Sequence, residues 1–406
     1  MPFLEGRLEQ RISLLRDYDT GVCSVTELCA QYGIDRSTFY YWLRRREGGD
    51  EGWFADRSRA AVCCPHKTDD RTVEAVIRVR RQLPHFGPKK VLAYLRAREP
   101  AGNWPAASTI GDIFKRAGLI AVKRRRRRSL EAGPVTQSAA AVNAEWACDF
   151  KGWFRTGDRM RCDPLTVSDG FSRFLVEVRI APPTIDGVKP VFEQVFAEHG
   201  LPEAIRCDNG SPFGSTGAGG LTRLSVWWLK LGVRPRFTRP GSPQDNGRHE
   251  RMHRDLKRQT ALTPARDLGE QQARFDAFRR HFNEERPHEA IDQAVPASLW
   301  RPSPRAMPET LIEPWYDADH QVRRVRPAGD IKFRGSCTYI GAAFAGEFVG
   351  LAEREDGTHL VRFFDLDLGI IDRAGAFRRF APRRHWLRKA PEGESVGNGP
   401  GLICGE

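Results

Sequence analysis

Three acidic residues in the middle of the chain have neighbours that suggest metal-dependent chemistry. Asp149 lies in an apolar, strand-like run, Asp208 ends a later run of the same kind, and Glu250 lies on an expected helix. A carboxylate in a buried strand is costly unless a partner compensates its charge. Hard cations such as Mg²⁺ prefer oxygen ligands, and two such ions together can activate water and stabilise the leaving oxygen of a phosphodiester. The pattern therefore indicates phosphodiester chemistry at these three carboxylates.

Some of these features also have an ordinary structural interpretation. In "AIRCDNGSPFG", Asp208 is followed by Asn209-Gly210, the favoured pair for a hairpin turn. Other acids compete for the same roles: Asp163, Asp169 and Asp245. Among these, Asp169 precedes a glycine and is expected to form a turn, and Asp245 is expected to cap the helix that carries Glu250.

The surroundings of Glu250 favour the chemical interpretation. His253, Arg254 and Lys257 follow it at steps of three, four and seven, so they are expected to share its helical face. A cationic stripe beside a metal-binding acid would hold a substrate phosphate against the metal. An ordinary surface helix with a local Glu–Arg pair is the alternative.

The elements that must position these acids fall in residues 141–305. Strand-like runs rich in Val, Leu and Phe come first, and later strands alternate with amphipathic helices. This order implies one α/β domain with a mixed sheet and helices on its faces. Within it, "GSTGAGG" at 214–220 is expected to be a flexible insertion.

The N-terminal segment, residues 1–48, has the pattern of a helix-turn-helix domain. Ser24 and Glu27 form a capping box, Gly33 ends the first helix, and Asp35 is expected to cap the second. A plain three-helix bundle with solvated polar residues is the alternative. On the DNA-binding interpretation the second helix presents residue types that contact phosphates and base edges: Arg36, Ser37, Thr38, Tyr40, Tyr41 and Arg44.

The other domain boundaries follow from changes in composition. Residues 48–58 are expected to be a linker, and residues 65–120 a second helical, helix-turn-helix-like domain in which Ser108 caps a helix. Residues 315–385 alternate apolar and polar positions between glycine turns, which suggests a small β-barrel-like domain for DNA or protomer contact. Residues 386–406 are expected to be disordered. Residues 121–140 form a basic linker that would tether the DNA backbone, through Lys123, Arg124, Arg125, Arg126, Arg127 and Arg128.

Charge and cysteine content narrow the function classes. Residues 1–130 contain 26 Lys and Arg against 15 Asp and Glu, while the rest of the 406-residue chain contains 39 against 37. A basic N-terminal part followed by a nearly neutral remainder is typical of proteins that bind nucleic acids. Nine scattered cysteines, with only Cys63-Cys64 and His66 close together, fit reduced thiols and no structural zinc. With no secretory signal and no long apolar run, we expect a soluble cytoplasmic protein that associates with the nucleoid rather than with a membrane.

Five motifs together carry a resemblance: "WACDFKG", "VSDGFSRF", "RCDNGSPF", "RPGSPQDNGRHERMHRDLK" and "FNEERPHEAI". In this order they resemble the integrase-type core of bacterial insertion-sequence transposases, in the DDE superfamily that includes retroviral integrases. The resemblance implies a ribonuclease-H-like fold, Asp149, Asp208 and Glu250 as the catalytic metal-binding triad for Mg²⁺ or Mn²⁺, with two ions, and Lys257 as a DNA contact. Between Asp208 and Glu250 lie 41 residues, more than in most relatives.

The expected function is that of a transposase. It would bind double-stranded DNA at the ends of a mobile element, hydrolyse phosphodiesters to free 3′ hydroxyls, and join these to target DNA, with no covalent protein–DNA intermediate. Joining two ends requires a homo-oligomer assembled on DNA, a dimer or a tetramer. Two alternatives stay open: a nuclease of the same fold that cuts without joining, and a DNA-binding regulator with an inactive core.

Overall fold

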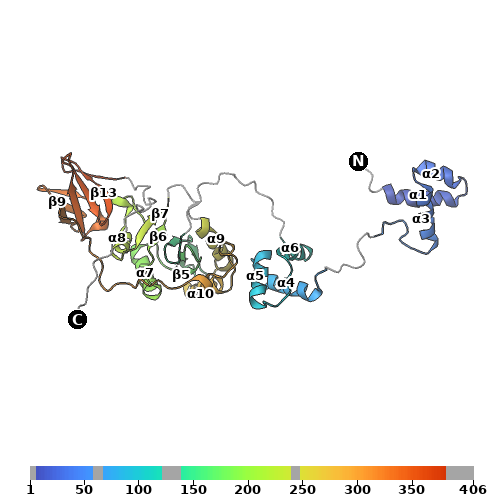
Figure 1. The fold of residues 1–406 in the computed structure, drawn as a ribbon, viewed down its shortest axis with the longest axis horizontal. Helices are drawn as coiled ribbons and strands as arrows, with labels where there is room; N and C mark the ends of the chain where they lie inside the picture. The colour runs from blue at the N-terminus through green and yellow to red at the C-terminus, as the bar shows by residue number, and fades with distance from the viewer. Residues whose placement is uncertain (1–5, 58–66, 121–138, 239–246, 381–406) are drawn as a thin grey trace, which may run out of the picture. The chain divides into compact units, whose positions relative to one another are not determined.

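The computed structural model describes residues 6–57, 67–120, 139–238 and 247–380. The chain divides into two compact units, Met1–Asp69 and Asp70–Glu406, which are described separately below. Figure 1 shows the ribbon of both.

The first unit is a three-helix domain with α1 (Gly6–Asp19), α2 (Val25–Tyr32) and α3 (Arg36–Glu47). The expected capping box is present, because Ser24 and Glu27 exchange hydrogen bonds at the start of α2. Gly33 ends α2 in the left-handed conformation at φ 63°, which a glycine adopts without steric cost. Asp35 precedes α3, but its side chain makes no capping hydrogen bond, so that expectation is wrong. The core of the unit is formed by Leu14, Leu15, Leu28, Cys29, Phe39, Trp42 and Leu43.

The segment expected to be a linker instead folds back onto this domain as far as residue 57. The buried Arg45 side chain donates to the Asp50 carboxylate and to the carbonyls of Gly52 and Ala55. Trp53 packs against the helical core. A basic residue near the end of α3 therefore organises the glycine-rich turn that follows it.

The second unit begins with three more helices, α4 (Asp70–Gln82), α5 (Pro88–Arg98) and α6 (Ala107–Arg116). Their apolar cluster is centred on Phe86, Ile110 and Phe114, as the spacing of apolar residues in the sequence indicates. Ser108 does not cap α6: it lies inside the helix, and the residue at the cap position is Ala106.

A five-stranded mixed sheet forms the centre of the second unit, in the order β5-β4-β1-β6-β7. The central strand β1 is antiparallel to β4 and parallel to β6, and β6 is parallel to β7. The five strands are β1 (Trp146–Phe150), β4 (Pro164–Asp169), β5 (Leu175–Ile180), β6 (Ala204–Cys207) and β7 (Arg234–Phe237). A short hairpin, β2 (Phe154–Arg155) and β3 (Arg161–Cys162), connects β1 to β4.

Helices cover both faces of this sheet (Figure 1). One face packs against α7 (Ile185–His199) and α8 (Arg223–Lys230) through a cluster rich in Phe and Trp. The other packs against α9 (Gly247–Leu256) and α10 (Leu268–Glu284). Side chains alternate across a strand, so Cys148 enters the first cluster while Asp149 lies on the α9 side. The α/β expectation for this segment is therefore met.

The C-terminal β domain contains two small sheets. One has the order β14-β13-β12-β11-β8 and the other pairs β9 with β10. Their strands are β8 (His320–Arg324), β9 (Asp330–Phe333), β10 (Ser336–Tyr339), β11 (Phe348–Glu353), β12 (His359–Phe363), β13 (Leu366–Ile371) and β14 (Phe377–Arg379). Alternating residues of β9, β11, β12 and β13 are buried in one apolar cluster, so the two open sheets pack into one small β domain at the place that the sequence pattern predicts.

The "GSTGAGG" segment is part of that packing and is not the free flexible insertion that was expected. Gly214 bridges to Leu221, and a short 3₁₀ turn, η1 (Ala218–Gly220), lies between them. Ala218 and Leu221 are buried in the same cluster as Leu368 of β13. The glycines allow this close approach, because a Cβ on Gly219 would stand 3.2 Å from a Leu368 methyl carbon. The integrase-like sheet and the β domain therefore share a hydrophobic core.

Candidate active site

The three acids come from three elements at one end of the central sheet. Asp149 lies on the central strand β1, Asp208 follows directly after the neighbouring parallel strand β6, and Glu250 is in the first turn of α9. Asp149 is largely buried, with 24% of its side chain exposed, whereas Asp208 and Glu250 are exposed. Because β1 and β6 are adjacent and parallel, their carboxyl ends bring the first two acids to the same edge.

The charges of Asp208 and Glu250 act on the ionisation of Asp149. Burial, together with the charges of Asp208 and Glu250, raises the pKa of Asp149 to about 7. Burial also raises the pKa of Asp208, while a backbone hydrogen bond from Gly210 opposes the shift. Carboxylates that repel one another in a partly buried place are stabilised by a shared cation. Their all-oxygen donor set fits a hard divalent ion such as Mg²⁺ or Mn²⁺.

A hydrogen-bonded network fixes α9 over β1. The Thr166 hydroxyl, on β4 directly opposite Asp149, donates to the Asp149 carbonyl oxygen at 3.0 Å. The Nε2 atoms of His249 and His253 lie 3.0 and 2.8 Å from the same hydroxyl oxygen. Since that hydroxyl has one proton and two lone pairs, both imidazoles donate to it from Nε2. This network holds Glu250, which lies between the two histidines in the sequence, close to Asp149.

The sequence analysis missed Thr166 and His249, and it gave His253 the wrong role. His253 is 8% exposed, and burial lowers its pKa far below the ordinary value, so it is neutral and not part of an exposed cationic stripe. Its Nδ1 lies 3.9 Å from an Asp149 carboxylate oxygen. Burial likewise lowers the pKa of His249 to about 4. The available signal was the i, i+4 spacing of the two histidines, which places them on one face of α9.

Exposed cations lie near the acids on other parts of this edge. Arg254 on α9 is exposed, and Lys257 is exposed at the start of a π-helical turn, η3 (Lys257–Ala261). Lys151, two residues after Asp149, has its pKa lowered by burial and by the charge of Lys257. The charges of these two lysines therefore interact close to Asp149.

Asn209 and Gly210 do not form the hairpin turn that their pairing suggests. The strands on either side, β6 and β7, are parallel and are connected through α8. Asn209 instead donates from its side-chain amide to the Thr238 carbonyl, 2.7 Å away, at the end of β7. Gly214 packs against the Asn209 backbone so closely that a Cβ there would lie 2.9 Å away. Asp208 is therefore held in a loop that is anchored on both sides.

The competing acids have structural partners. Asp169 is buried and accepts hydrogen bonds from the backbone nitrogens of Asn143 and Ser172, which confirms its expected role in a turn. Asp163 accepts two hydrogen bonds from Arg161. Asp245 lies outside the described residues.

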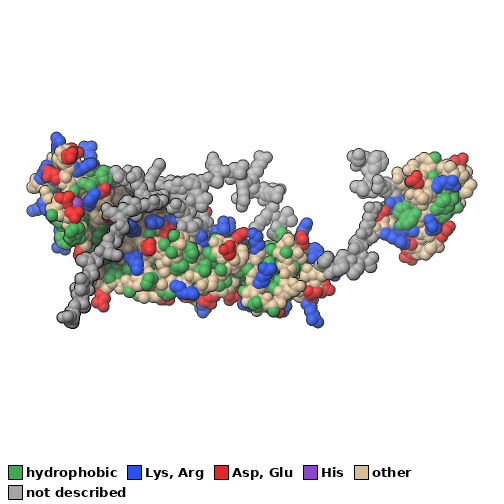
Figure 2. Space-filling view, viewed as in Figure 1, with side chains coloured by type: hydrophobic (Ala, Val, Ile, Leu, Met, Phe, Trp, Pro, Cys, Tyr) green, Lys and Arg blue, Asp and Glu red, His purple; other side chains and the backbone are tan. Residues whose placement is uncertain are grey.

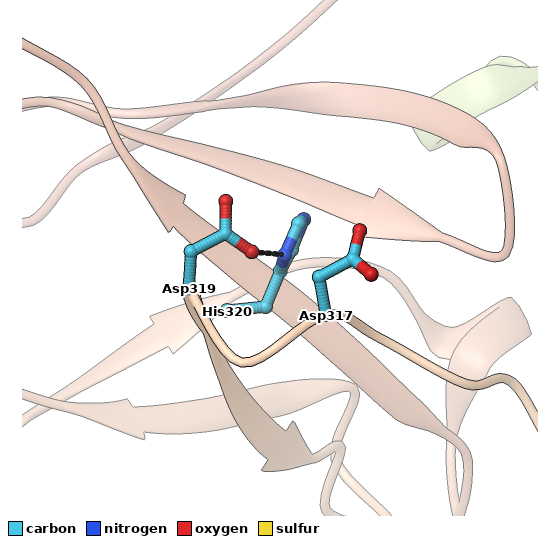
Figure 3. A group of neighbouring side chains, drawn as sticks. All are labelled: Asp317, Asp319 and His320. Carbon is cyan, nitrogen blue, oxygen red and sulfur yellow. Dashed lines mark hydrogen bonds and ion pairs between the residues drawn. The ribbon is translucent and has the colours of Figure 1, made fainter.

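A second acidic group stands in the β domain, away from these acids in the sequence. Asp317, Asp319 and His320 each offer a ligand atom within 4.8 Å of the other two, and among the described residues they are the one such group. In Figure 3 the His320 ring stands between the two carboxylates and is hydrogen-bonded to Asp319 at 2.7 Å. The His320 backbone also donates to the Asp317 carbonyl, so an ordinary turn brings the three together. The ligand atoms of Asp149, Asp208 and Glu250 do not all approach one another this closely.

The expected DNA-contact residues of the first unit lie on an exposed face of α3. Thr38 is half-buried, and the others are exposed: Arg36, Ser37, Tyr40, Tyr41 and Arg44. Basic side chains are visible on this unit in Figure 2. The basic run from Lys123 to Arg128, the pair Cys63-Cys64 and His66, and residues 386–406 lie outside the described residues.

Family models match most of this architecture. Two models described as integrase core domain match residues 139–243 and 231–296, and a transposase C-terminal domain of the IS481 family matches residues 320–376. A helix-turn-helix domain model matches residues 10–61, and a homeodomain-like model matches residues 38–114. These matches define a multidomain protein with a helical N-terminal region, an integrase core and a C-terminal β domain.

Two curated relatives are proteins of insertion elements. The IS476 uncharacterized 39.2 kDa protein of Xanthomonas euvesicatoria is 27% identical over 53% of this chain and 60% of its own length. The IS407 uncharacterized 31.7 kDa protein of Burkholderia multivorans is 26% identical over 58% of this chain and 82% of its own length. The matched part of the chain thus spans less than two thirds of the length of the IS476 protein. Together with the family models, these relatives show that the chain is similar to insertion-sequence proteins and carries matches to an integrase core and to an IS481-family transposase C-terminal domain.

The solved structures that match part of the chain include viral integrases. The catalytic core of BIV integrase is 20% identical, covers 39% of this chain and 93% of its own, and has a TM-score of 0.30. An intasome of simian T-cell lymphotropic virus with a PP2A regulatory subunit is 15% identical, covers 72% of this chain and 99% of its own, and has a TM-score of 0.34. Separately, within the described residues no helix combines the length and apolar character needed to cross a bilayer.

Proposed function

We propose that this protein is a DNA transposase that binds the ends of its element, cuts a phosphodiester to free a 3′ hydroxyl, and joins that hydroxyl to target DNA. The observation that carries the proposal is the set of three acids at one end of the sheet, where burial and the charges of Asp208 and Glu250 raise the pKa of Asp149. Asp149, Asp208 and Glu250 would hold two divalent ions there, either Mg²⁺ or Mn²⁺. When bound, such ions polarise the phosphodiester and activate the attacking oxygen.

The protein's own residues position the reacting groups. Thr166, His249 and His253 fix the helix that carries Glu250, and Asn209 anchors the loop that carries Asp208. Because all these groups are neutral, they leave the negative field of the acids intact. Positioning of this kind is the main contribution a protein makes to phosphoryl transfer.

Cations beside the acids are suited to hold the DNA backbone. Lys151, Arg254 and Lys257 would neutralise phosphates next to the scissile bond. The exposed face of α3, with Arg36 and Arg44, would recognise the element ends. Since two ends must be joined together, the active form would be a dimer or tetramer assembled on DNA, working in the nucleoid.

A cleavage and joining assay on a labelled duplex with the element's own end tests this function. The comparison uses the intact chain, Asp208→Asn, and the control Glu193→Gln, which changes a half-exposed acid on α7, on the opposite face of the sheet from α9. Each protein is incubated with Mg²⁺ and with EDTA. Metal-dependent joined products from the intact chain and the control, absent in Asp208→Asn, are the expected result.

Other outcomes would point to the alternatives. Cut ends without joined products would indicate a nuclease. DNA binding with no cleavage by any of the three proteins would indicate a regulator with an inactive core. Substituting Asp149, Asp208 or Glu250 with Ala should also leave end binding nearly intact, and parallel loss of binding in all three would contradict their assignment.

A further inference from the structure

The hairpin that follows Asp149 carries an exposed aromatic ring between two basic side chains. Trp153 is 57% exposed. The guanidinium carbons of Arg155 and Arg161 lie 5.8 and 5.3 Å from its ring centroid. Because the Trp153 ring is exposed, it adds little to the hydrophobic core of the domain. An exposed aromatic side chain flanked by cations is instead suited to binding a ligand.

The backbone sets the outward direction of this ring. Gly152 has φ +89°, which turns the chain sharply as it leaves β1. The next two residues then point to opposite sides. Phe154 packs inward against the α9–α10 cluster, with its ring edge-on to Phe275 at 6.4 Å, and Trp153 faces solvent. The exposure of Trp153 is therefore a consequence of strand alternation.

The hairpin is anchored at its far end as well. The backbone nitrogens of Gly157 and Asp158 donate to the carbonyls of Ala265 and Arg266, at 2.9 and 2.8 Å. Those two carbonyls belong to the segment that follows the helix of Glu250. The ring is thus presented by a structure that is fixed to both β1 and the α9 side of the domain.

Charge around the ring fits a polyanion. Residues 151–163 contain four cations and two acids, and one of the acids, Asp163, is paired with Arg161. Lys151 connects the hairpin to the candidate active site, because its charge interacts with those of Asp149 and Lys257. A ligand that contacts this surface would therefore extend from the acids across the hairpin.

We propose that Trp153 stacks on an unpaired nucleobase of the DNA end, while Arg155 and Arg161 contact the adjacent backbone. The inference rests on the proposed function, whose substrate is DNA. Paired bases inside a duplex already stack on their neighbours, so an exposed ring gains most from a base that has left the helix. Stacking of this kind tolerates any base, because every base has a π-face.

Equilibrium binding of the full chain to two DNAs tests the inference. One is a blunt duplex, and the other is the same duplex with a short oligo(dT) extension that contains 2-aminopurine. Both are measured in EDTA, so that cleavage does not contribute. We expect Trp153→Ala to weaken binding of the extended DNA by roughly 5- to 150-fold and that of the blunt duplex by much less.

Two controls separate stacking from loss of structure. Trp153→Phe keeps an aromatic face and should restore most of the affinity and the quenching of 2-aminopurine fluorescence. Trp315→Ala removes another exposed tryptophan, outside this hairpin, and should leave both unchanged. Arg155→Ala should weaken both DNAs alike and reduce the dependence of binding on salt.

Three results would overturn the inference. Equal weakening of both DNAs by Trp153→Ala, or no weakening of either, would exclude base stacking. Unchanged quenching together with a lower oligomeric state in sedimentation would assign the ring to a contact between protomers. Failure here is distinct from failure of the transposase proposal, because this test reads binding without cleavage and the earlier test reads metal-dependent products.

Discussion

Because the integrase-like sheet and the C-terminal β domain share a hydrophobic core, we expect Leu368→Ala to destabilise both of them. Leu368 on β13 is completely buried in a cluster that also contains Leu221, Val226 and Leu229 from the other part. Lys230 at the end of α8 reinforces this junction through an ion pair with Glu347 at 2.9 Å. If the two parts form one cooperative unit, a cavity in either of them destabilises both.

The expected size follows from the burial of this side chain. Truncating a buried leucine to alanine costs about 2–5 kcal/mol, through lost transfer free energy and the cavity that is left. Where hydrogen exchange proceeds by cooperative opening, this corresponds to roughly 30- to 5,000-fold faster exchange in every element that opens together. We therefore expect faster exchange in α8 as well as in β11 to β13.

Hydrogen exchange with mass spectrometry checks this, using peptides that cover α8 and the β strands. Leu360→Ala is the matched control, because Leu360 lies on the adjacent strand β12, is only half-buried and lies outside the cluster. It should have a clearly smaller effect. Faster exchange confined to the β strands in Leu368→Ala, with α8 unchanged, would refute the shared core.

Two further predictions concern buried charge. Glu145 is 5% exposed and accepts hydrogen bonds from Arg206 on β6 and Arg236 on β7. Glu145→Gln should therefore lower the free energy of unfolding, measured by urea titration, by about 3–5 kcal/mol. A loss under about 1 kcal/mol would contradict the pairing. Burial lowers the pKa of His288 to about 3, against about 6.5 in the unfolded chain, so its contribution to stability is complete above pH 6.5 and is lost as pH falls below that value. Between pH 7 and 5.5 this amounts to about 1 kcal/mol, and His288→Gln should lose correspondingly less stability over the same range; equal losses would show that His288 is not the group responsible.

Local signals in the sequence predicted elements well where the responsible atoms are close in the chain. The capping box of Ser24 and Glu27 is an example, since both partners lie within one turn of α2. Caps at Asp35 and Ser108 were predicted on the same grounds and were wrong, because the exact residue at which a helix begins depends on packing that residue types do not encode.

Features that depend on distant partners could not be predicted from the local pattern. "GSTGAGG" has the composition of a flexible loop, yet η1 packs against Leu368, which lies about 150 residues further along the chain. Asn209-Gly210 has the composition of a hairpin turn, but the Asn209 amide instead bonds to Thr238 at the end of a parallel strand. In both cases a tertiary contact overrides a valid local preference.

His253 shows why the candidate site was only partly predictable. Helical spacing placed it correctly near Glu250, and its residue type suggested a cation for the DNA backbone. Burial against Thr166 makes the imidazole neutral instead. The distinction matters for the chemistry, because a cation 3.9 Å from the Asp149 carboxylate would neutralise part of the negative field that binds a metal ion. A helix that must bring Glu250 to Asp149 is therefore best docked through neutral donors, and the pair of buried histidines on one hydroxyl meets that requirement.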